Sequence, residues 1–152
     1  MLRLPRRTMF AIEAVLDIAY NAGETPVRSG EITERQGIPP RYLEPVLQQL
    51  VRAGILVGVR GPRGGYRLGR DRRRISVGDI VRVAIGTDEE NAGTGNGNGG
   101  SALGRAAVKP LMLALETDAM TRLDATTIDE LCVKARAAGV ESANTTPMDF
   151  TI

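Results

Sequence analysis

Residues 38–70 read IPPRYLEPVLQQLVRAGILVGVRGPRGGYRLGR, and this stretch decides the fold of the chain. Its first half places apolar residues at the spacing of one helix face, and Gly54 follows as a stop signal. Two short runs typical of β-strands come next, at 55–59 and 66–68, separated by a glycine-rich turn. The pattern therefore predicts a helix followed by a tight β-hairpin. The apolar helix positions are Leu43, Val46, Leu47 and Leu50.

A second, shorter helix is predicted just before this stretch. Ser29 is a suitable N-cap, the helix runs to Gln36, and Gly37 can adopt the left-handed conformation that ends it. Two helices joined by Gly-Ile-Pro-Pro match the spacing of a helix-turn-helix. Pro40 suits the first position of the second helix. Pro45 lies further into that helix, where its missing backbone N–H removes a helical hydrogen bond. It therefore predicts a late helix start or a slight kink.

The front half of the chain is basic. Residues 1–74 hold 14 Lys+Arg against 7 Asp+Glu, a balance of +7, whereas residues 75–152 hold 6 against 11, a balance of −5. Every basic residue of the first part is an arginine, whose planar guanidinium suits phosphates and guanine edges. The chain opens with a basic lead-in, residues 1–7, and an apolar helix that Thr8 is expected to cap and Gly23 to end. The front half is therefore the part expected to meet a polyanion.

A helix followed by a basic hairpin predicts a mainly α fold, in which a winged helix-turn-helix binds double-stranded DNA. The helix would enter the major groove with its polar side chains, and the hairpin would act as a two-stranded wing on the adjacent backbone. Arginine can bind guanine, glutamine can bind adenine, and glutamate can accept from cytosine. The candidate DNA-binding residues are Arg41, Tyr42, Glu44, Gln48, Gln49 and Arg52 in the helix and Arg60, Arg63, Gly64, Gly65, Tyr66 and Arg67 in the hairpin.

Two reciprocal capping pairs are predicted in the second half of the chain. Ser76 with Asp79 opens one helix, which is expected to stop at Gly86, and Thr127 with Glu130 opens the last helix. These signals depend only on residues three positions apart, so they indicate where each helix begins.

Four segments follow from this pattern. Residues 1–86 form the winged helix-turn-helix domain, and residues 87–102, rich in Gly and Asn and without hydrophobic period, form a flexible loop. Residues 103–139 hold a long helix and the final short helix. Residues 140–152 form a loosely held tail.

The long helix of the third segment is apolar over more than one face, and Pro110 marks where its regular part is expected to begin. In a small protein, such a helix is expected to bury one side in its own domain and the other in a partner. The candidate dimerisation residues are Leu111, Met112, Leu115, Ala119, Met120 and Leu123.

The composition excludes several classes of protein. The 152 residues suit one compact domain with an appendage, and Cys132, the only cysteine, cannot form an internal disulfide. Histidine is absent, which removes the commonest general base and metal ligand, so neither an enzyme, a metal site nor a cofactor is expected. The hairpin phrase GPRGGY lacks the Lys-Ser/Thr pair of a phosphate-binding loop. Without a signal peptide or a long apolar run, we expect a soluble, cytoplasmic protein that does not engage membranes.

The motifs resemble the Rrf-two family of bacterial winged helix-turn-helix transcription regulators, of the IscR, NsrR, RirA and CymR type. The resemblance lies in the opening helix, the YLE helix with its RGPxGGY wing, the ISVGDIV helix and the TTIDELC segment. It implies a homodimer crossed through the long helix and bound to a palindromic promoter site. It also implies DNA contacts for Tyr42 and Glu44 and a minor-groove contact for Arg60. Many members hold an iron-sulfur cluster on three cysteines in the loop before the dimer helix, and this chain has none there.

Several alternatives remain at this stage. The same arginines would suit a winged-helix module that binds a protein or RNA partner. Gly64 and Gly65 would either expose N–H groups to phosphates or merely shape the hairpin. Cys132 is expected to be a small buried hydrophobe, with a redox switch as the alternative. The wide apolar helix would also suit a pocket for a small-molecule effector, and the run 70–74 is either a solvated surface or a phosphate contact.

Overall fold

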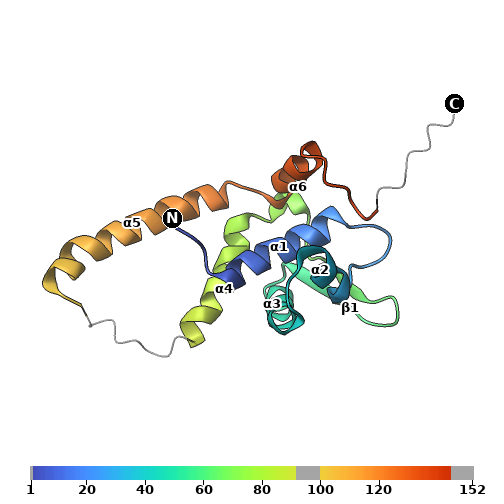
Figure 1. Cartoon of the computed structure of the whole chain (residues 1–152), viewed down its shortest axis with the longest axis horizontal. Coiled ribbons are helices and arrows are strands. Elements are labelled where there is room, and N and C mark those ends of the chain that lie inside the picture. The colour runs from blue at the N-terminus through green and yellow to red at the C-terminus, as the bar shows by residue number, and fades with distance from the viewer. Residues whose placement is uncertain (1, 92–99, 145–152) are drawn as a thin grey trace.

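The computed structural model describes residues 2–91 and 100–144, and it confirms the mainly helical winged helix fold. A two-stranded antiparallel sheet is added to a group of helices, and the long helix α5 lies along one side of the molecule (Figure 1). Among the described residues, every helix is too short or too polar to span a membrane. The elements are α1 Arg6–Tyr20, α2 Ser29–Gln36, α3 Pro40–Arg52, β1 Leu56–Val59, β2 Gly65–Leu68, η1 Arg72–Arg74, α4 Val77–Asn91, η2 Gly104–Val108, α5 Lys109–Asp124 and α6 Ile128–Ala137.

The helix α1 is the centre of the core. It packs against α2, α3, α4, α6 and the second strand, so elements from both halves of the chain share one apolar interior. Burying a large aliphatic side chain contributes about 1.5–3 kcal/mol, which makes this shared cluster the main stabilising feature. Its largest fully buried side chains are Val15, Ile18, Ile32, Ile38, Leu43, Leu47, Leu50, Ile55, Leu56, Ile75, Ile80 and Ile128.

The helix-turn-helix has the predicted helices, but Ser29 is not the N-cap: it is the first residue of α2, Arg28 takes the cap position, and no side chain caps the helix. Helix α2 ends at Gly37, which adopts the left-handed conformation with φ of 67°, and α3 begins at Pro40. The late start that Pro45 predicted is wrong, because α3 is continuous through that residue. Pro45 lacks one helical hydrogen bond, and the buried face of α3 offsets that loss.

The expected ends of the first helix are wrong at both positions. The helix begins at Arg6, with Pro5 before it and the N–H of Met9 donating to the Pro5 carbonyl at 3.1 Å. Thr8 is therefore inside the helix and buried. The helix ends before Gly23, because Asn21 closes the last turn by donating from its side-chain amide to the Asp17 carbonyl at 2.9 Å.

The hairpin has the predicted strands, with Leu56 opposite Leu68 and Val59 opposite Gly65. A third piece of strand, which the sequence did not indicate, joins it at Val27. The N–H of Tyr66 donates to the Val27 carbonyl at 2.7 Å, and the N–H of Val27 donates back at 3.0 Å. The wing, defined as residues 56–68, is thus fastened to the connection between α1 and α2.

Hydrogen bonds at the helix starts confirm the Ser76–Asp79 pair in both directions and the Thr127 cap in one direction. The N–H of Asp79 donates to the Ser76 hydroxyl at 3.0 Å and the N–H of Ser76 donates to the Asp79 carboxylate at 3.0 Å. The N–H of Glu130 donates to the Thr127 hydroxyl at 3.1 Å. The capping signals are local, and this is why the sequence alone located them.

The expected stop at Gly86 is wrong, because α4 continues to Asn91. A glycine inside a helix costs only about 1 kcal/mol relative to alanine, and α4 packs against both α1 and α5. The predicted loop 87–102 is helical at both of its ends, since Ala102 already has helical backbone. Residues 92–99 lie outside the described residues.

The C-terminal half is joined to the winged domain by backbone pairing. The N–H of Val77 donates to the Thr126 carbonyl at 2.8 Å, and the N–H of Ile128 donates to the Ile75 carbonyl at 2.9 Å. The regular part of α5 starts at Lys109, next to Pro110 as predicted, after the π-helical turn η2. Proline cannot donate inside a helix, so its place in the first turn of α5 is the one that it tolerates.

The first part of the tail is held more firmly than predicted. The Ser142 hydroxyl donates to the Tyr20 carbonyl at 2.8 Å, and the N–H of Ala143 donates to the Asn21 side chain at 2.8 Å. The Tyr20 hydroxyl donates to the Val140 carbonyl. The end of α1 therefore anchors residues 140–144, and the predicted loose tail beyond them lies outside the described residues.

Replacing Asp17 with alanine should destabilise the protein by about 2 kcal/mol, because three hydrogen bonds to a buried carboxylate are lost, while the partly exposed Arg35 keeps its ion pair with Glu31. The Asp17 carboxylate is buried and accepts from Arg35 Nε at 2.9 Å, Arg35 Nη2 at 2.8 Å and Gln36 Nε2 at 2.8 Å. Urea unfolding at one protein concentration measures the loss. The matched control is Asp118→Ala on an exposed position of α5, expected to change stability by less than about 0.5 kcal/mol. Equal losses would contradict the structural role of Asp17.

Candidate nucleic-acid interface

The solvent side of α3 carries the polar residues that the sequence singled out. The helix buries its four apolar positions against the core, so its other face is open. The guanidinium of Arg41 lies 4.7 Å from the ring centroid of Tyr42, which keeps both side chains together at the first turn. This placement leaves a row of hydrogen-bonding groups on one helix face. The exposed candidates are Arg41, Tyr42, Glu44, Gln48 and Arg52, and Gln49 is half-buried.

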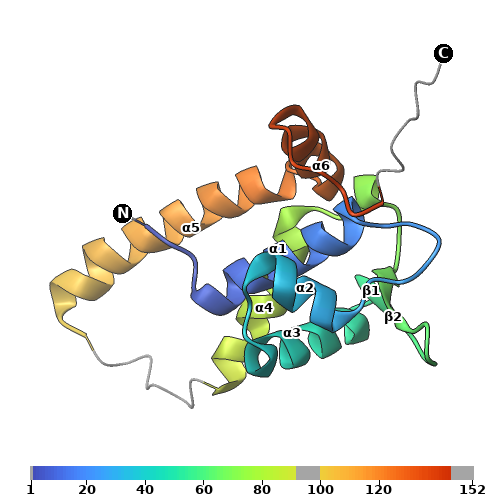
Figure 2. The same ribbon diagram turned by 45° about the vertical axis from the view of Figure 1, so that its right-hand side comes forward.

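The wing lies next to α3 and projects from the group of helices (Figure 2). Arg60 and Arg63 are exposed at its turn. Tyr66 on β2 is half-buried, and burial together with the negative charge of Glu44 raises the pKa of its phenol. Helix α3 also packs against β1, so the helix and the wing lie side by side.

The two wing glycines are required by the hairpin itself. The N–H of Gly64 donates to the Gly61 carbonyl at 2.9 Å, so the turn already uses it. A Cβ on Gly64 would lie 2.3 Å from the Val59 carbonyl oxygen, and one on Gly65 would lie 2.4 Å from the Val27 carbonyl oxygen. These contacts favour the alternative in which the glycines shape the hairpin.

Tyr66 and Arg67, two further candidate DNA-binding residues of the wing, form hydrogen bonds within the chain. The guanidinium of Arg67 donates to the Gly23 carbonyl at 3.2 Å and also to the Glu24 carbonyl, whereas the backbone of Tyr66 pairs with Val27. Both residues therefore hold the wing against the connection between α1 and α2. Arg60 and Arg63 are the wing arginines left to reach outward.

Arg28 belongs to the same attachment, although sequence analysis did not single it out. It precedes α2, and its guanidinium donates to the Pro62 carbonyl at 2.6 Å. This contact spans the distance between the helix-turn-helix and the turn of the wing. No local pattern could have indicated it, because the partner is a backbone carbonyl far along the chain.

Two of the four arginines in the run 70–74 form ion pairs within the chain. Arg70 forms an ion pair with Asp79 at 3.0 Å, and Arg72 forms one with Asp129 at 2.8 Å. Arg73 and Arg74 are exposed. The run therefore connects the wing to α4 and α6, and only part of it is available as a solvated surface.

The candidate dimerisation residues fall into two groups. Met120 and Leu123 are half-buried against the core of their own chain. Ala119 is exposed, as are Leu111, Met112 and Leu115, whose exposed fractions are 58%, 48% and 40%. Figures 1 and 2 show the N-terminal end of α5 projecting clear of the other helices. The helix thus covers its own core with one end and leaves an apolar face uncovered at the other.

Cys132 is buried, as predicted for a small apolar side chain. Its exposed fraction is 1%, and burial raises the pKa of the thiol despite the opposing charge of Arg72. A neutral, enclosed thiol is a poor nucleophile.

Comparison with known proteins identifies the family. The sequence model of the Rrf2 (Rrf-two) family, described as an iron-dependent transcriptional regulator, matches residues 4–134. The chain belongs to the Rrf2 family. One relative is the HTH-type transcriptional regulator IscR of Vibrio cholerae serotype O1, which is 44% identical over 80 residues. The matched region covers 53% of this chain and 46% of that relative. IscR of Sodalis glossinidius is 44% identical over 80 residues, 48% of its length. The chain thus spans about half the length of these relatives.

Solved structures of similar proteins agree with the fold of this Rrf2 protein. The structure of T. potens IscR matches with a TM-score of 0.72 and 30% identity, covering 93% of each chain. CymR, titled the global cysteine regulator of B. subtilis, matches with a TM-score of 0.67 and 25% identity over 88% of this chain and 98% of that one. The relatives are regulators, in agreement with the prediction that the chain is not an enzyme.

Replacing Gly65 with alanine should open the pairing of Val27 with Tyr66 in this Rrf2 protein, because the added Cβ would overlap the Val27 carbonyl. Loss of two hydrogen bonds of about 1 kcal/mol each should speed amide exchange at these two residues by about 30-fold. Exchange measured by NMR gives the rates. The control is Gly58→Ala on β1, where a Cβ meets nothing within 4 Å. Equal protection in both variants would show that the pairing does not depend on Gly65.

Proposed function

We propose that the chain is a homodimeric, sequence-specific DNA-binding transcription regulator that binds a palindromic promoter site without an iron-sulfur cluster. The observation that carries the proposal is the exposed polar face of α3 beside the outward arginines of the wing. The proposal also rests on membership of the Rrf2 family.

In this proposal α3 enters the major groove. Gln48 and Arg52 lie about two and about three turns after the first-turn pair of Arg41 and Tyr42, so the exposed groups follow the groove along the helix. Glutamine and arginine can each make bidentate contacts with a base, worth about 1–3 kcal/mol of discrimination. The wing arginines Arg60 and Arg63 would take the backbone or the narrow minor groove, where negative potential attracts guanidinium groups.

A second copy of the chain is the proposed partner of α5. Leu111, Met112, Leu115 and Ala119 recur at the three- and four-residue spacing of one helix face and are exposed. A two-fold dimer through this face would present two copies of α3 to the duplex. A palindrome with half-sites about one helical turn apart is the sequence that such a pair would bind.

The donor set does not fit an iron-sulfur cluster of three thiolates. The sequence holds one cysteine and no histidine, and Cys132 is enclosed by apolar residues of its own core. Among the described residues, no group of three His, Cys, Asp or Glu side chains could hold a metal ion. We therefore propose that this chain does not use the cluster of its cluster-binding relatives. Iron in the purified protein, with cluster absorbance, would contradict this part of the proposal.

Selection of bound sequences from random duplexes tests the function. We expect enrichment of one palindrome, and we expect the logarithm of its affinity to fall steeply and linearly with the logarithm of salt concentration. Failure to enrich any sequence would overturn the proposal and favour the module that binds a protein or RNA partner. A redox role for Cys132 and a small-molecule effector stay predictions.

A further inference from the structure

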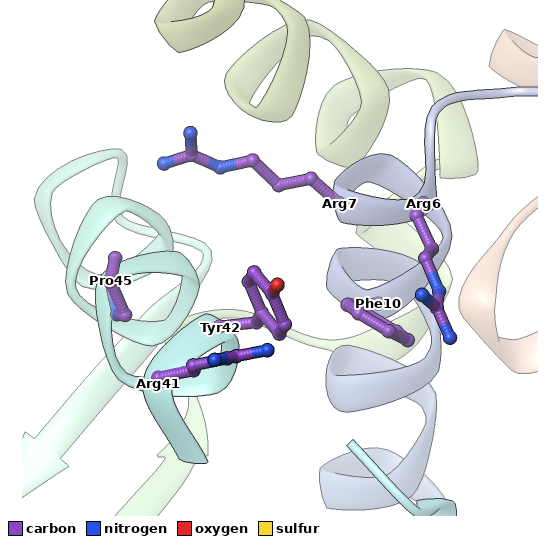
Figure 3. A pocket seen from close by; sticks show the side chains of 6 residues that line it. All are labelled: Arg6, Arg7, Phe10, Arg41, Tyr42 and Pro45. Atoms are coloured by element: carbon purple, nitrogen blue, oxygen red, sulfur yellow. The ribbon is translucent and has the colours of Figure 1, made fainter. Parts of the chain in front are cut away.

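The start of α1 and the first turns of α3 enclose a hollow of about 470 Å³. Figure 3 shows that the lining side chains come from two helices: Arg6, Arg7 and Phe10 belong to α1, and Arg41, Tyr42 and Pro45 belong to α3. These two segments are far apart in the sequence. The packing of α1 against α3 is what brings them together.

Two aromatic rings form the centre of the hollow. The ring centroids of Phe10 and Tyr42 are 6.1 Å apart with an angle of 36° between the planes. The guanidinium of Arg6 lies 5.7 Å from the Phe10 centroid, as that of Arg41 lies over Tyr42. Stacking on a ring restricts an arginine side chain while its N–H groups remain able to donate. These contacts place Arg6 and Arg41 beside the two rings.

The lining is positively charged and contains no carboxylate. Within the described part of the chain, the ion pairs found do not include Arg6 or Arg41. The first turn of α1 has no acidic residue, so the positive end of the helix dipole adds to the arginine charges. The guanidinium groups of Arg6 and Arg41, together with the start of α1, are suited to an anion with several acceptor oxygens.

We propose that this hollow binds a backbone phosphate of the DNA, next to the bases that α3 contacts. The proposal rests on the proposed function. Arg41 and Tyr42 belong both to the hollow and to the exposed face of α3, so a duplex on α3 brings a strand across the start of α1. A phosphate held there fixes the register of the protein on the duplex and does not select bases. The DNA-binding surface thus includes Arg6 and Arg7, which lie outside the helix-turn-helix.

Affinity and its salt dependence give the first test, on the duplex selected by the parent protein. The variants are Arg6→Gln and the double variant Arg6→Gln/Arg7→Gln. We expect the double variant to bind at least about tenfold more weakly, and its log–log salt slope to shrink by about 0.9 for each phosphate that it no longer neutralises. The preferred sequence should not change. The control is Lys134→Gln/Arg136→Gln on α6, which removes the same charge at exposed positions and should leave the salt slope unchanged.

Duplexes with a single uncharged methylphosphonate, moved one position at a time along each half-site, give the second test. At one flanking position the parent protein should lose about tenfold in affinity, and Arg6→Gln/Arg7→Gln should lose none there. Thermal unfolding of both proteins checks that the variant is folded, and Arg6→Gln alone repeats the test if the double variant is not.

The inference is overturned if every methylphosphonate weakens the variant as much as the parent, or if the variant binds with an unchanged salt slope. A third outcome also overturns it: inorganic phosphate alone perturbs the Arg6 NMR signals, and the methylphosphonate scan shows no position that depends on Arg6. The hollow would then bind free phosphate and not the DNA backbone. These outcomes leave the proposed function standing. That function fails separately, if the parent protein selects no sequence.

Discussion

Reversing the charge of the wing, by the double variant Arg60→Glu/Arg63→Glu, should weaken binding of the selected palindrome by about 1000-fold. The estimate takes about 1 kcal/mol for each arginine, the low end for a DNA contact, and four such arginines in a dimer. The loss is expected because these two side chains are exposed at the turn of the wing, whereas Arg67 donates to carbonyls of its own chain. Fluorescence anisotropy with a labelled duplex measures the two dissociation constants.

The matched control reverses the same number of charges on α6. Lys134→Glu/Arg136→Glu changes net charge equally at exposed positions of a helix that the proposed interface does not include. We expect it to lower affinity by less than about tenfold, through the long-range charge alone. An Arg60→Glu/Arg63→Glu variant that held the duplex as tightly as the control variant would remove the wing from the interface.

Placing charges on the apolar face of α5, by Leu111→Glu/Leu115→Glu, should convert the proposed dimer to a monomer. Each buried leucine is worth at least about 1.5 kcal/mol, and four of them in a dimer amount to about 6 kcal/mol, or about ten-thousand-fold in the dissociation constant. Sedimentation equilibrium over a range of concentrations measures it. The monomer should also bind a palindrome no more tightly than a single half-site.

Helix geometry supplies the control for this variant. Leu113 and Thr117 lie on the opposite side of α5 from Leu111 and Leu115, because two residues correspond to more than half a turn. Both are exposed, so Leu113→Glu/Thr117→Glu adds the same charge to the same helix. We expect this protein to remain a dimer. A parent protein that is monomeric at all concentrations, or two variants that dissociate alike, would exclude the proposed dimer face.

The attachment of the wing explains why Arg60 and Arg63, and not Arg67, are the wing arginines left to reach outward. Arg28, Val27 and Arg67 connect it to the residues before α2, and the two glycines permit the close approach that this attachment requires. The wing is therefore positioned by the same segment that positions the helix-turn-helix. A fixed relation between α3 and the wing is what a regulator needs to contact the groove and the backbone together.

The sequence by itself determined the local elements of this protein. The apolar face of α3, the left-handed Gly37, the hairpin and both capping pairs each depend on residues a few positions apart, so their physical cause lies within the segment. The wing phrase joined to the helix was also enough to predict the family. These features would be expected in any chain with the same short motifs.

Only the tertiary structure decided which of these residues are engaged elsewhere. Packing against α1 and α5 carries α4 past Gly86, although the local signal predicts a stop. Arg67 and Arg28 are committed to carbonyls far along the chain, and Phe10 meets Tyr42 across two helices. Such contacts join positions separated by tens of residues, and their energies depend on the folded arrangement of the core, which no short pattern contains.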